Sequence, residues 1–160
     1  MRKQILKYIE KKSKVDLGEL AVMLGTDEVT VANEIAAMEN EKIICGYHTL
    51  IDWEKAGEDK VTALIEVRVT PQRNQGFDRI AERIYNYPEV QSVYLMSGGY
   101  DLCLIIEGRT MKEVAYFVAQ KLAPIEYVIS TATHFVLRKY KDKGVIYGAE
   151  QVDERGFGNL

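Results

Sequence analysis

Two kinds of hydrophobic spacing alternate between residues 61 and 140, and their order limits the possible folds more than any other feature. Strand-like segments rich in Val and Ile lie at 61–69, 90–96, 102–106 and 128–140. Apolar residues at helical spacing lie at 77–85 and 114–122, and a proline follows each of these segments. The order strand, helix, two strands, helix, strand predicts a ferredoxin-like βαββαβ domain, a four-stranded antiparallel sheet with both helices on one face.

Helices on one face of such a sheet leave its other face bare. Strands this apolar would then expose a large hydrophobic patch, and a second copy of the chain is the most economical cover. We therefore expect a homodimer formed sheet to sheet. The tail at 141–160 is polar and rich in glycine. We expect its residues 145–147 to add one short strand to a partner, and the residues beyond about Ala149 to be mobile.

The first 50 residues carry the pattern of a winged helix-turn-helix. Ile5, Leu6 and Ile9 mark a first short helix, and Gly25 separates two further helical segments. Asp27 is placed to cap the last of these helices. The apolar stripes of the two helices around Gly25 are Leu17, Leu20, Ala21 and Leu24, then Val31, Ile35 and Met38. The β-branched segment 43–51 predicts a strand or short wing. The predicted class is α+β, with a helix-turn-helix domain at 1–50, a linker at 51–60, a ferredoxin-like domain at 61–140 and the tail.

A helix-turn-helix favours DNA binding, whereas the charge of its second helix opposes it. Residues 27–41 contain five acidic side chains and no Lys or Arg, and the whole chain has a net charge of -3. Thr30 and Asn33 are the candidates for contacts with base edges, because Asn pairs with adenine and Thr with the thymine methyl group. Phosphate contacts would come from lysines that flank the unit, namely Lys3, Lys12, Lys14 and Lys42. The alternative is a metabolite-binding or assembly-modulating oligomer that has lost strong DNA binding.

Composition and motifs argue against several other classes. Cys45 and Cys103 are too few for a disulfide framework, and they favour a reducing cytoplasm. Cys45 and His48 have a spacing that a metal could use, but a structural zinc site needs about four ligands, so no metal or other cofactor is expected. We find no secretion signal, no membrane-length apolar run and no catalytic constellation, so we expect a cytoplasmic protein that is not an enzyme.

The segment Ser97-Gly98-Gly99-Tyr100-Asp101 joins two predicted strands and is the candidate small-molecule site. Two glycines allow the backbone to approach a ligand closely, and Asp101 could bind an ammonium group. Thr131 and Thr133 project from one face of the last strand and could line the same cleft. The simpler alternative is an ordinary β-turn with a capping Asp and two strand threonines.

Three local segments in this order resemble the Lrp/AsnC, or feast/famine, family of transcriptional regulators. They are the segment 43–47 ending in Gly-Tyr, the hairpin 93–102 with Gly-Gly-Tyr-Asp, and Thr131-Ala132-Thr133. The resemblance implies DNA binding, dimers formed through the sheets, and assembly into tetramers, octamers or related rings. It also implies that amino acids bind near the hairpin, between dimers, and so change assembly and DNA binding. One departure is clear: family members commonly carry several Arg residues along the second helix, whereas Asn33, Glu34, Ala36 and Ala37 stand here.

Overall fold

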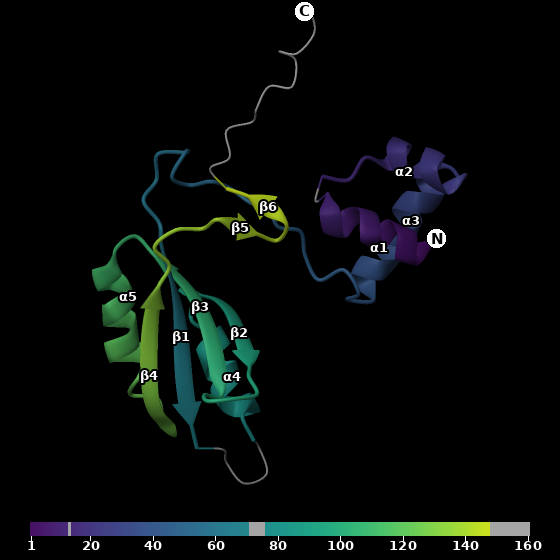
Figure 1. Ribbon diagram of the computed structural model, residues 1–160. Helices are drawn as coiled ribbons and strands as arrows, with labels where there is room; N and C mark the ends of the chain where they lie inside the picture. Colours follow the sequence, from purple (N-terminus) through teal and green to yellow (C-terminus); the bar gives the residue numbers. More distant parts are fainter. Residues whose placement is uncertain (13, 71–75, 148–160) are drawn as a thin grey trace, which may run out of the picture. The chain divides into compact units, whose positions relative to one another are not determined.

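The computed structural model describes residues 1–12, 14–70 and 76–147 (Figure 1). The chain divides into two compact units, Met1–Ile51 and Asp52–Leu160, which are described separately below.

The first unit is a three-helix bundle of α1 (Arg2–Lys11), α2 (Leu17–Leu24) and α3 (Glu28–Asn40). Asp16 and Asp27 cap α2 and α3, each by accepting a backbone hydrogen bond of 2.9 Å from the residue three positions on. Gly25 ends α2 with φ of 65°, a left-handed conformation that glycine adopts without strain. The buried core consists of Ile5, Leu20, Ala21, Val31, Met38 and Ile44. The helices expected on either side of Gly25 are therefore confirmed.

The expected strand or wing at 43–51 is wrong. Ile43 and Ile44 both donate backbone hydrogen bonds to the carbonyl of Met38, so they close the end of α3, and Ile44 packs into the bundle core. Residues 45–51 then run without regular secondary structure and are mostly exposed. A strand needs a hydrogen-bonded neighbour, and the described residues of this unit contain no second strand to provide one.

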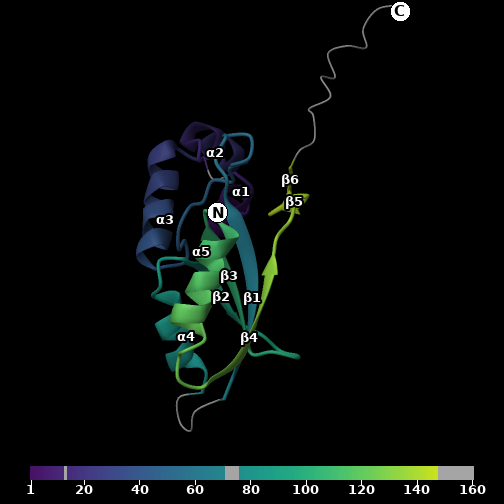
Figure 2. The same cartoon turned by 90° about the vertical axis from the view of Figure 1, so that its left-hand side faces the viewer.

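The second unit is an antiparallel sheet with the strand order β2-β3-β1-β4. Its elements follow the chain as β1 (Val61–Val69), α4 (Asp78–Tyr85), β2 (Val90–Leu95), β3 (Leu102–Gly108), α5 (Met111–Phe117), the π-helical turn η1 (Val118–Leu122) and β4 (Val128–Phe135). Figure 2 shows α4 and α5 on the same side of the sheet. This is the expected ferredoxin-like plan.

Alternate residues of the central strands form the core between sheet and helices. In β1 the buried residues are Ala63, Ile65, Val67 and Val69, and they pack with Ile80 and Ile84 of α4 and with Val114 and Phe117 of α5. The residues between them in β1 project from the face that the helices leave bare. On that face Leu64 lies between Ile105 of β3 and His134 of β4, and Glu66 lies between Cys103 and Ala132.

Two details of the C-terminal part differ from expectation. β4 ends at Phe135 rather than at residue 140, because it runs out of partner residues near the start of β1. Residues 145 and 146 form a strand, β6 (Val145–Ile146), which pairs with β5 (Lys141–Asp142), a strand that the sequence did not predict. The addition of β6 to a partner stays a prediction. Lys143 and Gly144 join these strands with φ of 44° and 86°, as a tight two-residue hairpin requires. The predicted mobile segment beyond Ala149 lies outside the described residues.

Candidate functional site

The second helix of the helix-turn-helix, α3, presents an uncharged ridge. Val29, Asn33, Ala36 and Asn40 are all exposed, and their spacing places them on one face of the helix. Val31 and Met38 are buried on the opposite face. The carboxylates of α3 belong to neither face, because Glu28, Glu34 and Glu39 lie at intermediate positions around the helix. We call Val29, Asn33, Ala36 and Asn40 the neutral ridge.

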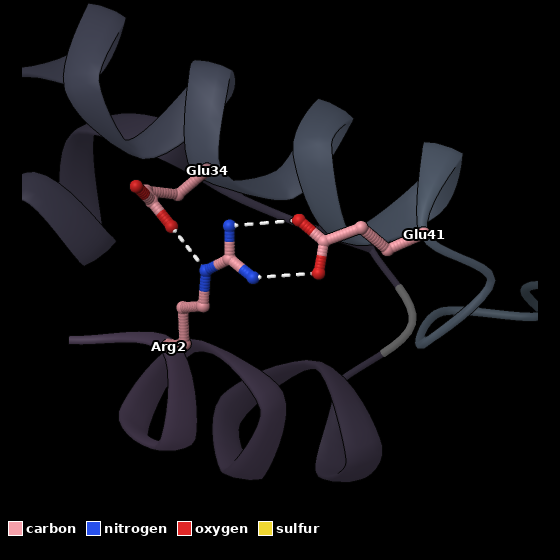
Figure 3. A network of polar contacts seen from close by, with 3 residues as sticks. All are labelled: Arg2, Glu34 and Glu41. Atoms are coloured by element: carbon pink, nitrogen blue, oxygen red, sulfur yellow. Dashed lines mark hydrogen bonds and ion pairs between the residues drawn. The ribbon is translucent and has the colours of Figure 1, made fainter.

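Arg2 binds the two carboxylates on one flank of this ridge (Figure 3). Its Nε lies 2.6 Å from Glu34 Oε2, and its two terminal nitrogens lie 2.8 and 3.0 Å from the two oxygens of Glu41, the C-cap of α3. These hydrogen bonds hold the pKa of the Glu41 carboxyl below its usual range, and the carboxylates raise the pKa of Arg2. Arg2 therefore offsets one of the two negative charges on this flank.

The opposite flank is organised by Tyr47 and by the start of α3. The Tyr47 hydroxyl donates a hydrogen bond of 2.8 Å to Glu39. Burial, together with this carboxylate, raises the pKa of Tyr47 to about 12. Glu28 stands in the first turn of α3, where the helix dipole favours an acid. Its side chain packs close to Gly18 of α2, where an added Cβ would lie 3.3 Å from Glu28 Oε1.

The predicted DNA contacts are not equally available. Asn33 is exposed on the neutral ridge, whereas the Thr30 hydroxyl is half-buried and donates a hydrogen bond of 2.7 Å to Asp27 within the helix cap. Lys12 forms an ion pair of 3.1 Å with Glu19, which also binds the Tyr8 hydroxyl. The remaining predicted cations, Lys3, Lys14 and Lys42, are exposed. Thr30 and Lys12 would each have to give up a hydrogen-bonding arrangement, at least in part, to contact DNA.

Asp101 has a structural role at the predicted effector turn. Its carboxylate accepts a hydrogen bond of 2.8 Å from the backbone N–H of Val69, and its own N–H donates to the carbonyl of Val67 at 3.0 Å. Asp101 therefore ties the hairpin between β2 and β3 to the end of β1, where β1 carries an irregularity. Ser97, Gly98 and Gly99 are exposed, and a Cβ added to either glycine would meet open space.

The other predicted effector residues lie on opposite faces of the sheet. Tyr100 hydrogen-bonds with Cys103 on the bare face, where burial raises the pKa of the Cys103 thiol. Thr131 and Thr133 pair with Val67 and Ile65, so they project from the helix-covered face. The expectation that the threonines share one face holds, but that face is not the one on which Tyr100 contacts Cys103.

The described residues give no support to a metal site. They contain no group of three or more His, Cys, Asp or Glu side chains that could hold an ion, and Cys45 instead donates to the carbonyl of Lys42. Among residues 1–12, 14–70 and 76–147, no helix has the length and apolar character needed to cross a membrane.

Sequence reasoning missed two polar contacts that the fold brings together. One is the Arg2 network, whose only local signal is a cation in the first turn of a helix, a position that the helix dipole disfavours. The other joins His134 Nε2 and Glu66 Oε1 at 3.3 Å across β4 and β1, on the bare face. No local signal marks this second pair, because it depends on strand register.

Comparison with known proteins agrees with both units. Residues 62–146 match the Lrp/AsnC ligand binding domain family. The HTH-type transcriptional regulator YugG of Bacillus subtilis is 46% identical over 153 residues, which are 95% of this chain and 92% of that protein.

Solved structures share the same fold at low sequence identity. AsnC of E. coli has a TM-score of 0.65 at 20% identity, covering 86% of this chain and 91% of the other. The transcriptional regulator NMB0573 of Neisseria meningitidis, solved as a complex with L-Met, has a TM-score of 0.70 at 20% identity, covering 88% and 90%. The chain thus belongs to the Lrp/AsnC family of helix-turn-helix transcriptional regulators.

Proposed function

We propose that this regulator binds duplex DNA through the neutral ridge of α3 and responds to an amino acid or related metabolite through its assembly. The observation that carries the DNA half is the ridge itself, an exposed helix face whose flanking carboxylates include three bound by Arg2 and Tyr47. Asn33 and Asn40 have the chemistry to pair with adenine, and Val29 and Ala36 can contact thymine methyl groups. Lys3, Lys14 and Lys42 would contact phosphates.

The effector half rests on the turn from Ser97 to Asp101. The ammonium group of an amino acid would bind the Asp101 carboxylate, and its carboxylate would bind backbone N–H groups near Gly98 and Gly99. Thr131 and Thr133 would line the effector cleft from the helix-covered face, at the same end of the sheet. A similar fold that binds L-Met supports an amino acid as the class of effector.

The bare face of the sheet supports the assembly. Leu64 and Ile105 lie at its centre with Cys103 and Ala132, and a second copy of the chain would cover them. Such dimers would join further into tetramers or octamers in the cytoplasm. An effector shifts this assembly only to the extent that it binds one state more tightly than the other.

A gel shift with a duplex from upstream of the chain's own gene tests DNA binding. Asn33→Ala should weaken binding to that duplex by about tenfold, because a good side-chain contact to a base contributes roughly 1–3 kcal/mol of discrimination. Gln4→Ala, an exposed amide on α1, is the matched control and should bind like the wild type. Absence of wild-type binding at low salt would instead support the oligomer that has lost DNA binding.

A thermal-shift screen over the amino acids tests the effector site. A bound ligand raises stability by RT ln(1 + [L]/Kd), so a hit appears as a concentration-dependent rise in Tm. Asp101→Asn keeps an acceptor for the Val69 N–H but removes the charge. This variant should keep the wild-type Tm without ligand and lose the ligand-dependent rise. An unchanged rise would show that the effector binds elsewhere.

A further inference from the structure

We propose that Arg2 is a positioning residue for DNA recognition, which holds Glu34 and Glu41 against α1 and offsets one of their two negative charges beside the neutral ridge. This inference rests on the proposed entry of α3 into the major groove. Arg2 acts through the two carboxylates and does not itself contact DNA.

Two members of the network, Arg2 and Glu41, are poorly placed within their own helices. Arg2 stands in the first turn of α1, where the positive end of the helix dipole repels a cation. Glu41 caps the C-terminus of α3, where the negative end repels an anion, and the last turn of α3 has no basic residue to offset this. Pairing across the two helices relieves both conflicts, so the arrangement depends on the packing of α1 against α3.

The guanidinium gives three of its five N–H groups to carboxylates. All three of its nitrogens donate to carboxylate oxygens, in a fork to Glu41 and a single bond to Glu34. Two N–H groups remain, one on each terminal nitrogen, and a phosphate that approached them would also meet both carboxylates. The partners are partly exposed, at 41% for Arg2, 29% for Glu34 and 49% for Glu41, so a carboxylate released by Arg2 would face solvent or DNA.

The position of the carboxylates explains why their charge matters. A helix in the major groove has phosphate backbones along both of its flanks, whereas its central ridge faces the bases. Glu34 and Glu41 stand on one flank of α3, seven residues apart. Without Arg2, two negative charges would lie beside the phosphates and repel them at distances within a Debye length.

The test compares DNA affinity in four versions of the full chain by fluorescence anisotropy with the upstream duplex. Arg2→Ala should weaken binding by about tenfold, from the repulsion of two freed carboxylates. Adding Glu34→Gln and Glu41→Gln to Arg2→Ala should restore affinity at least to the wild-type level, because this flank then carries no charge where the wild type keeps a net charge of about -1. The matched control adds Glu10→Gln and Glu54→Gln to Arg2→Ala. It has the same net charge as the rescued variant and should stay as weak as Arg2→Ala.

The salt dependence of binding separates the proposed role from a direct phosphate contact. The rescued variant should keep the wild-type slope of log Kd against log salt concentration, because the number of neutralised phosphates is unchanged. If Arg2 contacted a phosphate directly, the rescued variant, which lacks Arg2, would have a slope smaller than that of the wild type by about 0.9. Arg2→Lys keeps a cation between the carboxylates, and it should lose less affinity than Arg2→Ala even if the alanine variant folds poorly.

Each contrary result identifies what has failed. Four results would overturn the role of Arg2 alone. Arg2→Ala could bind as tightly as the wild type, or the added Gln substitutions could fail to restore affinity. The Glu10 and Glu54 control could restore affinity equally well, or the rescued variant could show a lowered salt slope. A wild-type chain that binds no duplex at low salt would overturn the proposed DNA binding, and the role of Arg2 with it.

Discussion

Tyr47 shows how one side chain can organise a flank of α3 from outside the helix. Its hydroxyl binds Glu39, and its partial burial keeps the phenol from ionising in the usual range. The segment that carries it has no regular secondary structure. This single contact therefore helps to tie that segment to the helical bundle.

The ionisation of Tyr47 makes a testable pH prediction. Its pKa is raised from 10 to about 12 in the folded chain. Because the folded value lies above the unfolded one, the stability that Tyr47 contributes is complete below pH 10 and is lost as the pH rises toward 12. The chain has ten tyrosines, so the measurement is the difference in tyrosinate absorbance between wild type and Tyr47→Phe.

Glu39→Gln is the control for the cause of the shift. Burial is the largest single cause of the raised pKa, followed by the hydrogen bond to Glu39 and then by the charge of Glu39. The pKa of Tyr47 should therefore fall in this variant while remaining above 10. Ionisation of wild-type Tyr47 at its ordinary value would contradict the contact with Glu39.

At the scale of elements, the two helices of the helix-turn-helix depend on the conformation of Gly25. Gly25 has φ of 65° and no atom within 4 Å of an added Cβ, so backbone strain is the only obstacle to a side chain. Gly99 has equally open surroundings, but its φ is not in the left-handed range. Because neither position is crowded, a difference in stability between alanine substitutions at Gly25 and Gly99 measures backbone strain.

Gly25→Ala should lower the free energy of unfolding by about 1 kcal/mol, the usual cost of a left-handed conformation for a residue with a Cβ. Gly99→Ala should change it little. Urea unfolding followed by circular dichroism measures both values. Equal stability of the two variants would mean that the chain does not hold Gly25 in this conformation.

Local signals explain which elements the sequence could predict. Asp16 and Asp27 cap helices through residues three positions away, and β1 buries alternate residues, so their patterns lie within one short window. The end of β4 and the pairing of β6 were missed because both depend on which strand lies alongside. The same holds at the candidate sites. Arg2 and Glu41 are 39 residues apart, and strand register decides that Thr131 and Tyr100 serve different faces.

For the whole molecule, the bare face of the sheet is the proposed interface between copies of the chain. Leu64 lies at the centre of that face, between Ile105 and His134. Leu64→Glu would place a carboxylate in the middle of the proposed interface, where its burial would be costly. The isolated fold should tolerate the change, because Leu64 is not fully buried there.

Leu64→Glu should therefore convert the assembly to monomers in sedimentation velocity experiments at concentrations where the wild type is oligomeric. Tyr116→Glu, at a side chain on α5 that is 65% exposed, is the control and should leave the oligomer intact. Dissociation by the control as well, or persistence of the wild-type oligomer in Leu64→Glu, would place the interface elsewhere.

The neutral ridge also affects how the protein competes for sites across a genome. Non-specific binding to DNA is almost entirely electrostatic. A helix without positive charge therefore binds only weakly to the competing sites of a genome, which number about 10⁶ or more. Fewer copies are then sequestered, and a small cellular pool can keep a specific site occupied. The corresponding cost is a shorter dwell time during sliding, which slows the search for that site.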